Sequence, residues 1–343
     1  MTTHAPAGID LDRLSAWAVV NLPQFHPPFA AEQIPGGRSN ITVRLIDADG
    51  KPSIVRRPPL HTTLATAHDV GREYRIIDAL GPTPVPVPEA YASCADDSVI
   101  GAPFYVMEFV DGIVLNDVRS AQRLDESARH RVNLSVVDAQ VALHAVDVDD
   151  VGLGDLARRD DYIGRQLRRW YRQYEAQQTD DLPGITRMYE LLTAKMPEQR
   201  ESTIVHGDLR SGNCVIDENG EVRAVLDWEL CTLGDPLADI GYLLATSPAP
   251  DDEVIADAVS PTIAPGFANR AEVAARYEAE SGRDLSRIDY YIAFSHWKLA
   301  CILQGVMVRT QAGAQGEQVG DLSFLRRRIE TSVELAERHT ADL

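Results

Sequence analysis

One segment, residues 206 to 229, constrains this chain more than any other. Asp208 and Asn213 are five positions apart, and Asp227 follows after a stretch that predicts a short hairpin. In phosphoryl transfer, an aspartate accepts the proton of the acceptor hydroxyl, and an asparagine and a second aspartate hold magnesium. Carboxylate and amide oxygens are also the ligands that this hard cation prefers. The spacing therefore predicts Asp208 as the catalytic base and Asn213 and Asp227 as metal ligands.

The same segment resembles the catalytic loop of aminoglycoside phosphotransferase-like small-molecule kinases, which have H-G-D-x-x-x-x-N followed by D-W/F-E. Protein kinases have H-R-D-x-x-x-x-N and D-F-G at these places, so Gly207 here replaces an arginine. The run from Val205 to Leu244 is most similar to the branch of the family that is fused to acyl-CoA dehydrogenases. This resemblance implies ATP and Mg²⁺ as cofactors and a small molecule with a hydroxyl group as acceptor.

The order of the predicted elements fits an α+β, bilobal, protein-kinase-like fold. Five β-rich runs and one helix predict a small five-stranded antiparallel lobe, and the segments beyond a hinge at 110–112 are mainly helical. We expect a nucleotide-binding lobe at 1–109, capped by a helix at 9–21, and a helical catalytic and acceptor-binding lobe at 110–343. The predicted strands are 31–35, 41–46, 53–57, 89–92 and 103–109, and the predicted helices are 68–80, 124–146, 160–177, 185–196, 268–281, 285–308 and 323–336.

A glycine-rich run, Gly-Gly-Arg-Ser-Asn at 36–40, lies between the first two predicted strands. A kinase fold places its phosphate-covering loop there, and relatives of this type have a similar G-G-x-S-N. Gly37 would allow the backbone to approach the phosphates closely, and Ser39 would donate its hydroxyl to the β-phosphate. The run is neither G-x-G-x-x-G nor a Walker A motif, so an ordinary hairpin is the alternative.

A kinase fold also needs a cation on the third strand, paired with a glutamate on the next helix. The only lysine of the small lobe, Lys51, lies in a turn, so Arg56 is the better candidate. Arginine is always charged and can hold two oxygens at once. Strand alternation places Ile54 on the same face, against the adenine, and turns Arg57 the other way. We expect Glu73 to pair with Arg56, with a solvated helix face as the alternative.

The strand before the hinge should hold the adenine. Met107 would lie behind the ring, and the backbones of Glu108 and Val110 would read its edge, although these side chains fit a core role equally well.

The remaining polar residues around the catalytic loop receive narrower roles. Arg210 stands where protein kinases have a lysine and would stabilise the transferring γ-phosphoryl, with a surface salt bridge as the alternative. We expect His206 to shape the loop. Asp235 and Asp239 would support the loop or cap the following helix. Glu229 is a weaker candidate for a second metal or the substrate.

A small acceptor is expected because only seven residues separate Asp227 from Asp235. That leaves no room for the activation segment and A-P-E motif with which protein kinases dock a peptide. The predicted helix 160–177 has four arginines opposite its apolar face. These are either solvated or paired with nearby acids, or they form a strip for an anionic acceptor such as a coenzyme A phosphate. An aminoglycoside would instead prefer acidic walls such as the run 147–150. The four arginines are Arg165, Arg168, Arg169 and Arg172.

Composition excludes several other classes of protein. A net charge of −19 over 343 residues argues against nucleic-acid binding. We expect no secretory signal, because the first ten residues have neither a basic region nor an apolar region. We also expect no membrane span, because the most apolar stretch, 290–308, is interrupted by polar residues and predicts a buried helix. Four scattered cysteines argue against zinc and disulfides and fit the cytoplasm.

A second class of function stays open, namely a pseudokinase that binds nucleotide without turnover. Arg56 in place of lysine and the weak glycine run favour this alternative, but a binding module has no need of the base Asp208.

Overall fold

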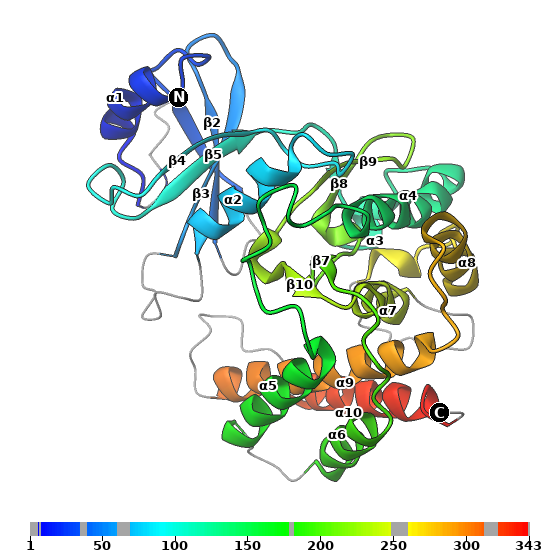
Figure 1. Cartoon of the computed structure of the whole chain (residues 1–343). Helices are drawn as coiled ribbons and strands as arrows, with labels where there is room; N and C mark the ends of the chain where they lie inside the picture. Colours follow the sequence, from blue (N-terminus) through cyan, green and yellow to red (C-terminus); the bar gives the residue numbers. More distant parts are fainter. Residues whose placement is uncertain are drawn as a thin grey trace.

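The computed structural model describes residues 6, 8–34, 40–59, 69–177, 182–247, 260–311 and 322–341. They form the predicted α+β, kinase-like fold, with a five-stranded antiparallel sheet in the amino-terminal part and mainly helices in the rest (Figure 1). The strands pair in the order β1-β2-β3-β5-β4. Their bounds are β1 (Ala30–Gln33), β2 (Ile41–Ile46), β3 (Pro52–Arg57), β4 (Ala90–Cys94) and β5 (Phe104–Glu108).

The two faces of this sheet have different neighbours. One face packs with α1 (Leu11–Asn21) in an apolar cluster, and the other packs with α2 (Val70–Leu80) in the main core of the protein. Because side chains alternate along a strand, Ile54 and Arg56 share the α2 side of β3. Arg57 points to the α1 side, as predicted, where its guanidinium donates to the carbonyl of Ile100 at 2.9 Å.

Helix α2 is anchored to the large lobe as well as to the sheet. Arg72 Nη2 donates to the carbonyl of Cys231 at 2.6 Å, and Arg75 Nη2 donates to the carbonyl of Gly152 at 2.7 Å. On the opposite face of the helix, buried residues recur at helical spacing, and one of them is acidic while the others are apolar. This face consists of Val70, Glu73, Ile76, Ile77 and Leu80, all buried.

Beyond β5 the chain is mainly helical, with two small sheets that carry the catalytic segment. The helices are α3 (Val118–Ala121), α4 (Glu126–His144), α5 (Tyr162–Ala176), α6 (Pro183–Ala194), α7 (Pro236–Thr246), α8 (Arg270–Ser281), α9 (Ile288–Gln311) and α10 (Leu322–Arg338). One small sheet pairs β7 (Thr203–Val205) with β10 (Thr232–Gly234), and the other has the order β6-β8-β9, with β6 (Ile113–Val114), β8 (Cys214–Ile216) and β9 (Val222–Val225). Strands β8 and β9 are the hairpin expected between Asn213 and Asp227.

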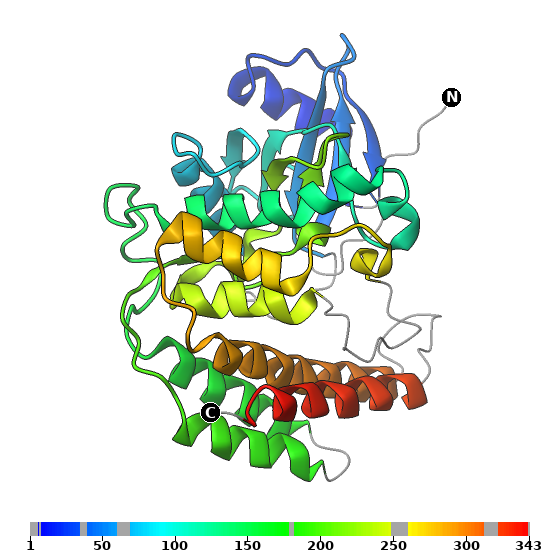
Figure 2. The same cartoon turned by 90° about the vertical axis from the view of Figure 1, so that its right-hand side faces the viewer.

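Helix α9 is the central element of the end farthest from the amino-terminal sheet, where it lies beside α10 with α5 and α6 nearby (Figures 1 and 2). Among the described residues it is the one helix long and apolar enough, by length and composition, to cross a membrane, but 72% of its apolar window is buried inside the protein. A core helix of this kind gives the same signal. The prediction of a buried helix in this stretch is therefore confirmed.

Candidate active site

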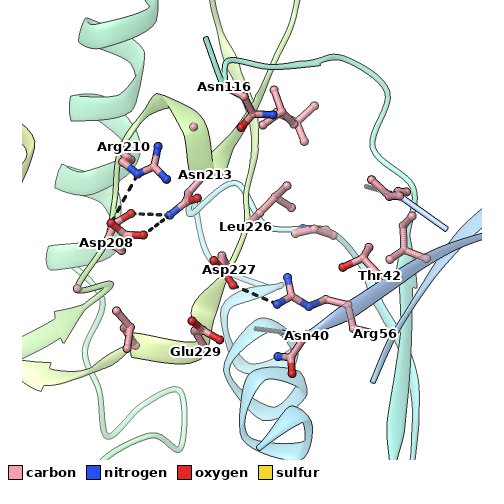
Figure 3. Close-up of a pocket in the computed structure, with 18 of the residues that line it drawn as sticks. Asn40, Thr42, Arg56, Asn116, Asp208, Arg210, Asn213, Leu226, Asp227 and Glu229 are labelled. Carbon is pink, nitrogen blue, oxygen red and sulfur yellow. Dashed lines mark hydrogen bonds and ion pairs between the residues drawn. The ribbon is translucent and has the colours of Figure 1, made fainter. Parts of the chain in front are cut away.

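A pocket of about 1010 Å³ lies between the amino-terminal sheet and the helical lobe. Its walls come from β3, from the segment after β5, from the catalytic loop, and from α7 and α9. Figure 3 shows that the catalytic-loop residues and Arg56 face one another across this space. Segments far apart in the sequence therefore meet in a single cavity, as the catalytic motif requires.

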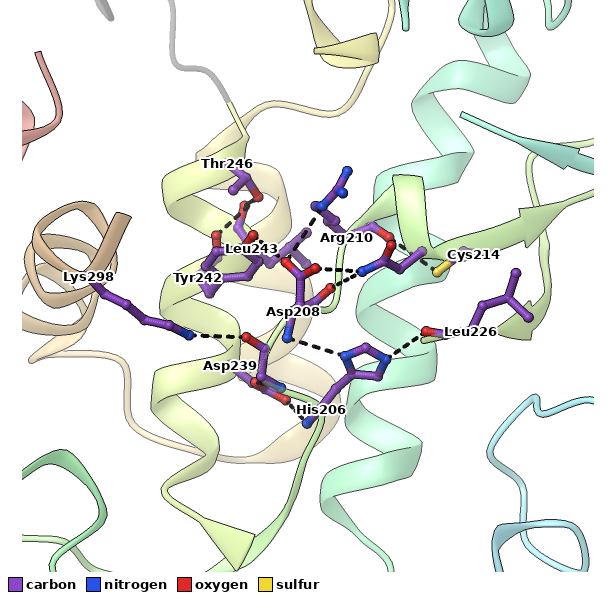
Figure 4. A network of polar contacts seen from close by, with 12 residues as sticks. His206, Asp208, Arg210, Cys214, Leu226, Asp239, Tyr242, Leu243, Thr246 and Lys298 are labelled. Carbon is purple, nitrogen blue, oxygen red and sulfur yellow. Dashed lines mark hydrogen bonds and ion pairs between the residues drawn. The ribbon is translucent and has the colours of Figure 1, made fainter. Parts of the chain in front are cut away.

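Asp208 is held on both carboxylate oxygens. Asn213 Nδ2 donates to Asp208 Oδ2 at 2.8 Å and also to the Asp208 carbonyl at 2.8 Å. The hydroxyl of Tyr242 donates to Asp208 Oδ1, and Arg210 Nε lies 3.6 Å from the same oxygen (Figure 4). The Asp208 side chain is still 26% exposed, so an acceptor can reach it from the pocket.

Asp239 holds the backbone of the loop that carries Asp208. This buried carboxylate accepts from the backbone N–H of His206 at 2.6 Å and of Gly207 at 2.8 Å. Desolvation raises the pKa of Asp239, but the hydrogen bond and charge of His144, with those of the loop, outweigh it and leave the pKa below its ordinary value. Asp239 therefore supports the loop as an anion, as the sequence predicts.

Two further residues give the loop its shape. Gly207 has φ +84°, and a Cβ there would lie 3.1 Å from the carbonyl oxygen of Leu230, so glycine is required on both grounds. His206 Nε2 donates to the carbonyl of Leu226 at 2.9 Å, which ties the loop to the strand end before Asp227. Asp235 caps α7 by accepting from the N–H of Leu237 at 3.0 Å. The structural roles expected for these residues are confirmed.

Asp227 adopts an unusual backbone conformation. Its φ of 67° and ψ of 58° place it in the left-handed region, which aspartate tolerates better than most residues. Such conformations concentrate at functional sites, where the surrounding structure holds them. The turn directs the carboxylate into the pocket, where Oδ1 accepts from Arg56 Nη2 at 3.0 Å (Figure 3).

The predicted ion pair between Arg56 and Glu73 is present. Arg56 Nε lies 3.2 Å from Glu73 Oε2, and the Glu73 side chain is only 2% exposed. Asn40 Nδ2 donates to Glu73 Oε1 at 2.6 Å, and the hydroxyl of Tyr105 donates to Oε2 at 2.9 Å. Desolvation raises the pKa of Glu73 despite the opposing effects of Arg56 and these two donors. Glu73 is thus held on every side and fixes Arg56 between itself and Asp227.

The residues around Asp227 could hold a divalent cation. Glu73, Asp227 and Glu229 each offer one carboxylate oxygen, and the three oxygens lie within 4.8 Å of one another. Of these three acids, Asp227 and Glu229 line the pocket and Glu73 does not. Figure 3 shows Asn213, Asp227 and Glu229 along one wall. This all-oxygen set fits Mg²⁺ and gives Glu229 a more central position than the sequence suggested.

The proposed adenine end of the pocket is mainly apolar. Ile54, Met107, Glu108 and Val110 all line it, as their positions on β3 and before the hinge predict. The predicted phosphate contacts Gly37 and Ser39 lie outside the described residues. Asn40, from the same run, lines the pocket and is buried.

The residues of α7 and α9 that line the pocket beside Asp208 were not predicted from the sequence. Tyr242 and Lys298 line the pocket beside Asp208, and Lys298 Nζ lies 3.3 Å from the carbonyl oxygen of Gly207. Desolvation lowers the pKa of Lys298, although Asp208 and Asp239 act against this shift. Lys298 is one of three lysines and interrupts an apolar stretch, which was the available signal. The apolar part of this wall comprises Leu299, Ile302, Leu303 and Val306.

Neither of the surfaces predicted to receive the acceptor lines this pocket. The arginines of α5 instead contact nearby protein groups, for example Arg168 with Asp161 at 2.5 Å and Arg165 with the carbonyl of Arg158 at 2.8 Å. The acidic run 147–150 also lies outside the pocket lining, and Asp149 there pairs with Arg159. These contacts fit the alternative in which the arginines are solvated or paired with nearby groups, and helical periodicity identifies such a face without saying which cavity it borders.

The model of the phosphotransferase enzyme family matches residues 30–289. The chain belongs to this family. It is 35% identical to acyl-CoA dehydrogenase family member 10 of Mus musculus over 311 residues, which cover 86% of this chain and 28% of that protein. It is 32% identical to the probable acyl-CoA dehydrogenase IBR3 of Arabidopsis thaliana over 322 residues, which cover 88% of this chain and 39% of that protein. The chain thus spans about a third of the length of these relatives, and the predicted branch is confirmed.

Solved structures agree with this assignment. A crystal structure of a Ralstonia eutropha protein, provisionally named an aminoglycoside phosphotransferase, superposes with a TM-score of 0.79 at 34% identity and covers 96% of this chain and 98% of that one. The GDP complex of aminoglycoside 2'-phosphotransferase-IIIa shares the fold, with a TM-score of 0.62 at 14% identity over 97% of this chain and 99% of that one.

Replacing Asp239 by alanine tests the support of the catalytic loop. The change leaves two buried N–H groups and His144 without their anion, so we expect the free energy of unfolding to fall by about 3 kcal/mol in urea titrations. Asp160→Ala removes an exposed pair with Arg158 and should cost less than about 1 kcal/mol. Equal losses in the two variants would contradict the role of Asp239.

Proposed function

We propose that this phosphotransferase moves the γ-phosphoryl group of Mg·ATP to a hydroxyl group of a small molecule. The observation that carries the proposal is the placement of Asp208 in the same pocket as Arg56 and the oxygen ligands around Asp227. A base at one end and a cation with a metal-binding wall at the other are the parts that phosphoryl transfer requires.

The nucleotide half of the proposal uses residues from both lobes. Arg56, held between Glu73 and Asp227, would bind α- and β-phosphate oxygens, and the strand before the hinge would receive the adenine. Asp227, Asn213 and Glu229 would hold Mg²⁺, which neutralises charge on the phosphates when bound. Support for a purine nucleotide comes from the related aminoglycoside phosphotransferase solved with GDP.

In the transfer step, the acceptor oxygen attacks the γ-phosphorus as the bond to ADP breaks, and Asp208 takes the hydroxyl proton. Asp208 need not be a strong base, because positioning and charge stabilisation dominate this chemistry. Arg210 lies beside Asp208, lines the pocket and has a side chain that is 41% exposed, so it could approach the transferring group.

The acceptor wall favours a hydroxy acid or its coenzyme A ester over an aminoglycoside. Four apolar side chains of α9 line the end of the pocket beyond Asp208, and Lys298 supplies a positive charge there. A polycationic acceptor would meet repulsion from Lys298 and, among the described residues of this wall, no acidic partner. An acceptor with an apolar body and a negative group matches both features. The relatives named as acyl-CoA dehydrogenases support the same choice.

The direct test is ADP release from Mg·ATP across a panel of aminoglycosides, macrolides, choline, hydroxy acids and their coenzyme A esters. We expect activity with hydroxy acids or their esters. Asp208→Asn should reduce it roughly 10²- to 10⁴-fold, the usual contribution of a general base, while the affinity for Mg·ATP stays within about twofold of wild type. Mg·ATP binding with silence across the panel would favour the pseudokinase alternative.

Replacing Arg56 tests the nucleotide clamp. Arg56→Ala removes charge-assisted hydrogen bonds to phosphate and should raise the KM for ATP by roughly 10- to 100-fold. Arg56→Lys keeps the charge but loses the two-oxygen contact, so its KM should lie between those of wild type and the alanine variant. An unchanged KM in folded Arg56→Ala would move the phosphate contact to another residue.

A further inference from the structure

Tyr242 is a polar residue of the active site that the mechanism above does not use. It lies on α7, lines the pocket, and directs its hydroxyl to Asp208 (Figure 4). No catalytic motif includes this position, yet its hydroxyl contacts the proposed base directly.

The hydrogen bonds of Asp208 show what this contact does. Asp208 Oδ2 already accepts from Asn213 Nδ2, which also donates to the Asp208 carbonyl. Oδ1 is therefore the oxygen that can receive the proton of an acceptor hydroxyl, and Tyr242 donates a hydroxyl proton to that same oxygen. Tyr242 thus makes the contact that an acceptor would make at the start of the reaction.

The surroundings of Tyr242 keep it a protonated and well-placed donor. Desolvation, together with the negative charge of Asp208, raises the pKa of Tyr242 well above its ordinary value, so it does not take the proton itself. Lys298 Nζ lies 5.5 Å from the centre of its ring. The preceding Gly241 packs against α9 so closely that a Cβ would lie 2.6 Å from Tyr291 Cβ. The backbone of α7 is therefore held in place here, and Asp208 Oδ1 becomes free by rotation of the Tyr242 hydroxyl, without movement of the helix.

We propose that the Tyr242 hydroxyl suppresses transfer of the γ-phosphoryl group to water, a role that we call the guard. The hydroxyl occupies Asp208 Oδ1 until an acceptor hydroxyl replaces it, so a water molecule cannot use the base in the meantime. This inference rests on the proposed function. The suppressed reaction is hydrolysis, in which a water oxygen attacks the γ-phosphorus, the bond to the ADP oxygen breaks, and the water proton passes to Asp208. Its products are ADP and inorganic phosphate.

Tyr242→Phe removes the hydroxyl and retains the ring, which leaves a polar position at Asp208 Oδ1 for a water molecule. We expect the release of ADP and phosphate from Mg·ATP without any acceptor to rise at least about tenfold, part of the gain that a general base supplies. The rise should disappear when Asp208→Asn is added. Tyr242→Leu, which removes the hydroxyl with a different side chain, should show the same gain.

Tyr291→Phe is the matched control. It also removes a tyrosine–aspartate hydrogen bond, to Asp235 Oδ2 at 2.7 Å, but Tyr291 is not among the residues that line the pocket. Hydrolysis should stay at the wild-type rate in this variant. A general loosening of the α7–α9 contact would instead raise hydrolysis in both tyrosine variants and overturn the guard.

The two proposals fail in different ways. Unchanged or slower hydrolysis in a folded Tyr242→Phe protein that binds Mg·ATP would overturn the guard alone and make Tyr242 a positioning residue for Asp208. Absence of Mg·ATP binding by the wild-type protein, measured by calorimetry, would overturn the proposed function and the guard together.

Discussion

The ion pair of Arg56 with Glu73 and Asp227 is the interaction on which the rest of the site depends. It joins β3 and α2 of the small lobe to the turn at Asp227 in the large lobe, and the Arg56 side chain is only 10% exposed. Buried charges are costly unless each is paired and hydrogen-bonded. Asn40 and Tyr105 donate to Glu73, and Arg56 Nη2 donates to Asp227. Each charge therefore has an oppositely charged partner and at least one hydrogen bond, although Arg56 Nε makes only the ion-pair contact. The pair therefore fixes the position of Arg56, the proposed phosphate ligand, relative to Asp208, the proposed base.

Asp208, the proposed base, is held by contacts that are separate from the ion pairs of Arg56. Asp239 fixes the backbone of the catalytic loop, and Asn213 holds Asp208 Oδ2 while the Tyr242 hydroxyl contacts Oδ1. Arg56 and Asp208 are held by residues of different elements. Each side chain can therefore be fixed in its position before substrates bind. Preorganised charges of this kind contribute most of the catalysis in phosphoryl transfer.

Local patterns predicted the parts of the site that lie within one motif or one strand. Asp208, Asn213 and Asp227 meet in one pocket, and alternation along β3 placed Arg56 on the correct face. Tyr242 and Lys298 were missed because helical periodicity reveals a buried face but not the cavity that it borders. The strands β6, β7 and β10 were missed because each has only two or three residues and pairs through tertiary contacts.

A crystal structure with Mg²⁺ and a non-hydrolysable ATP analogue would test the central claim most directly. The account predicts phosphate oxygens against Arg56, the metal held by Asp227 together with Asn213 or Glu229, and the γ-phosphate facing Asp208. A nucleotide bound outside this pocket, or one whose phosphates avoid Arg56 and Asp227, would contradict it.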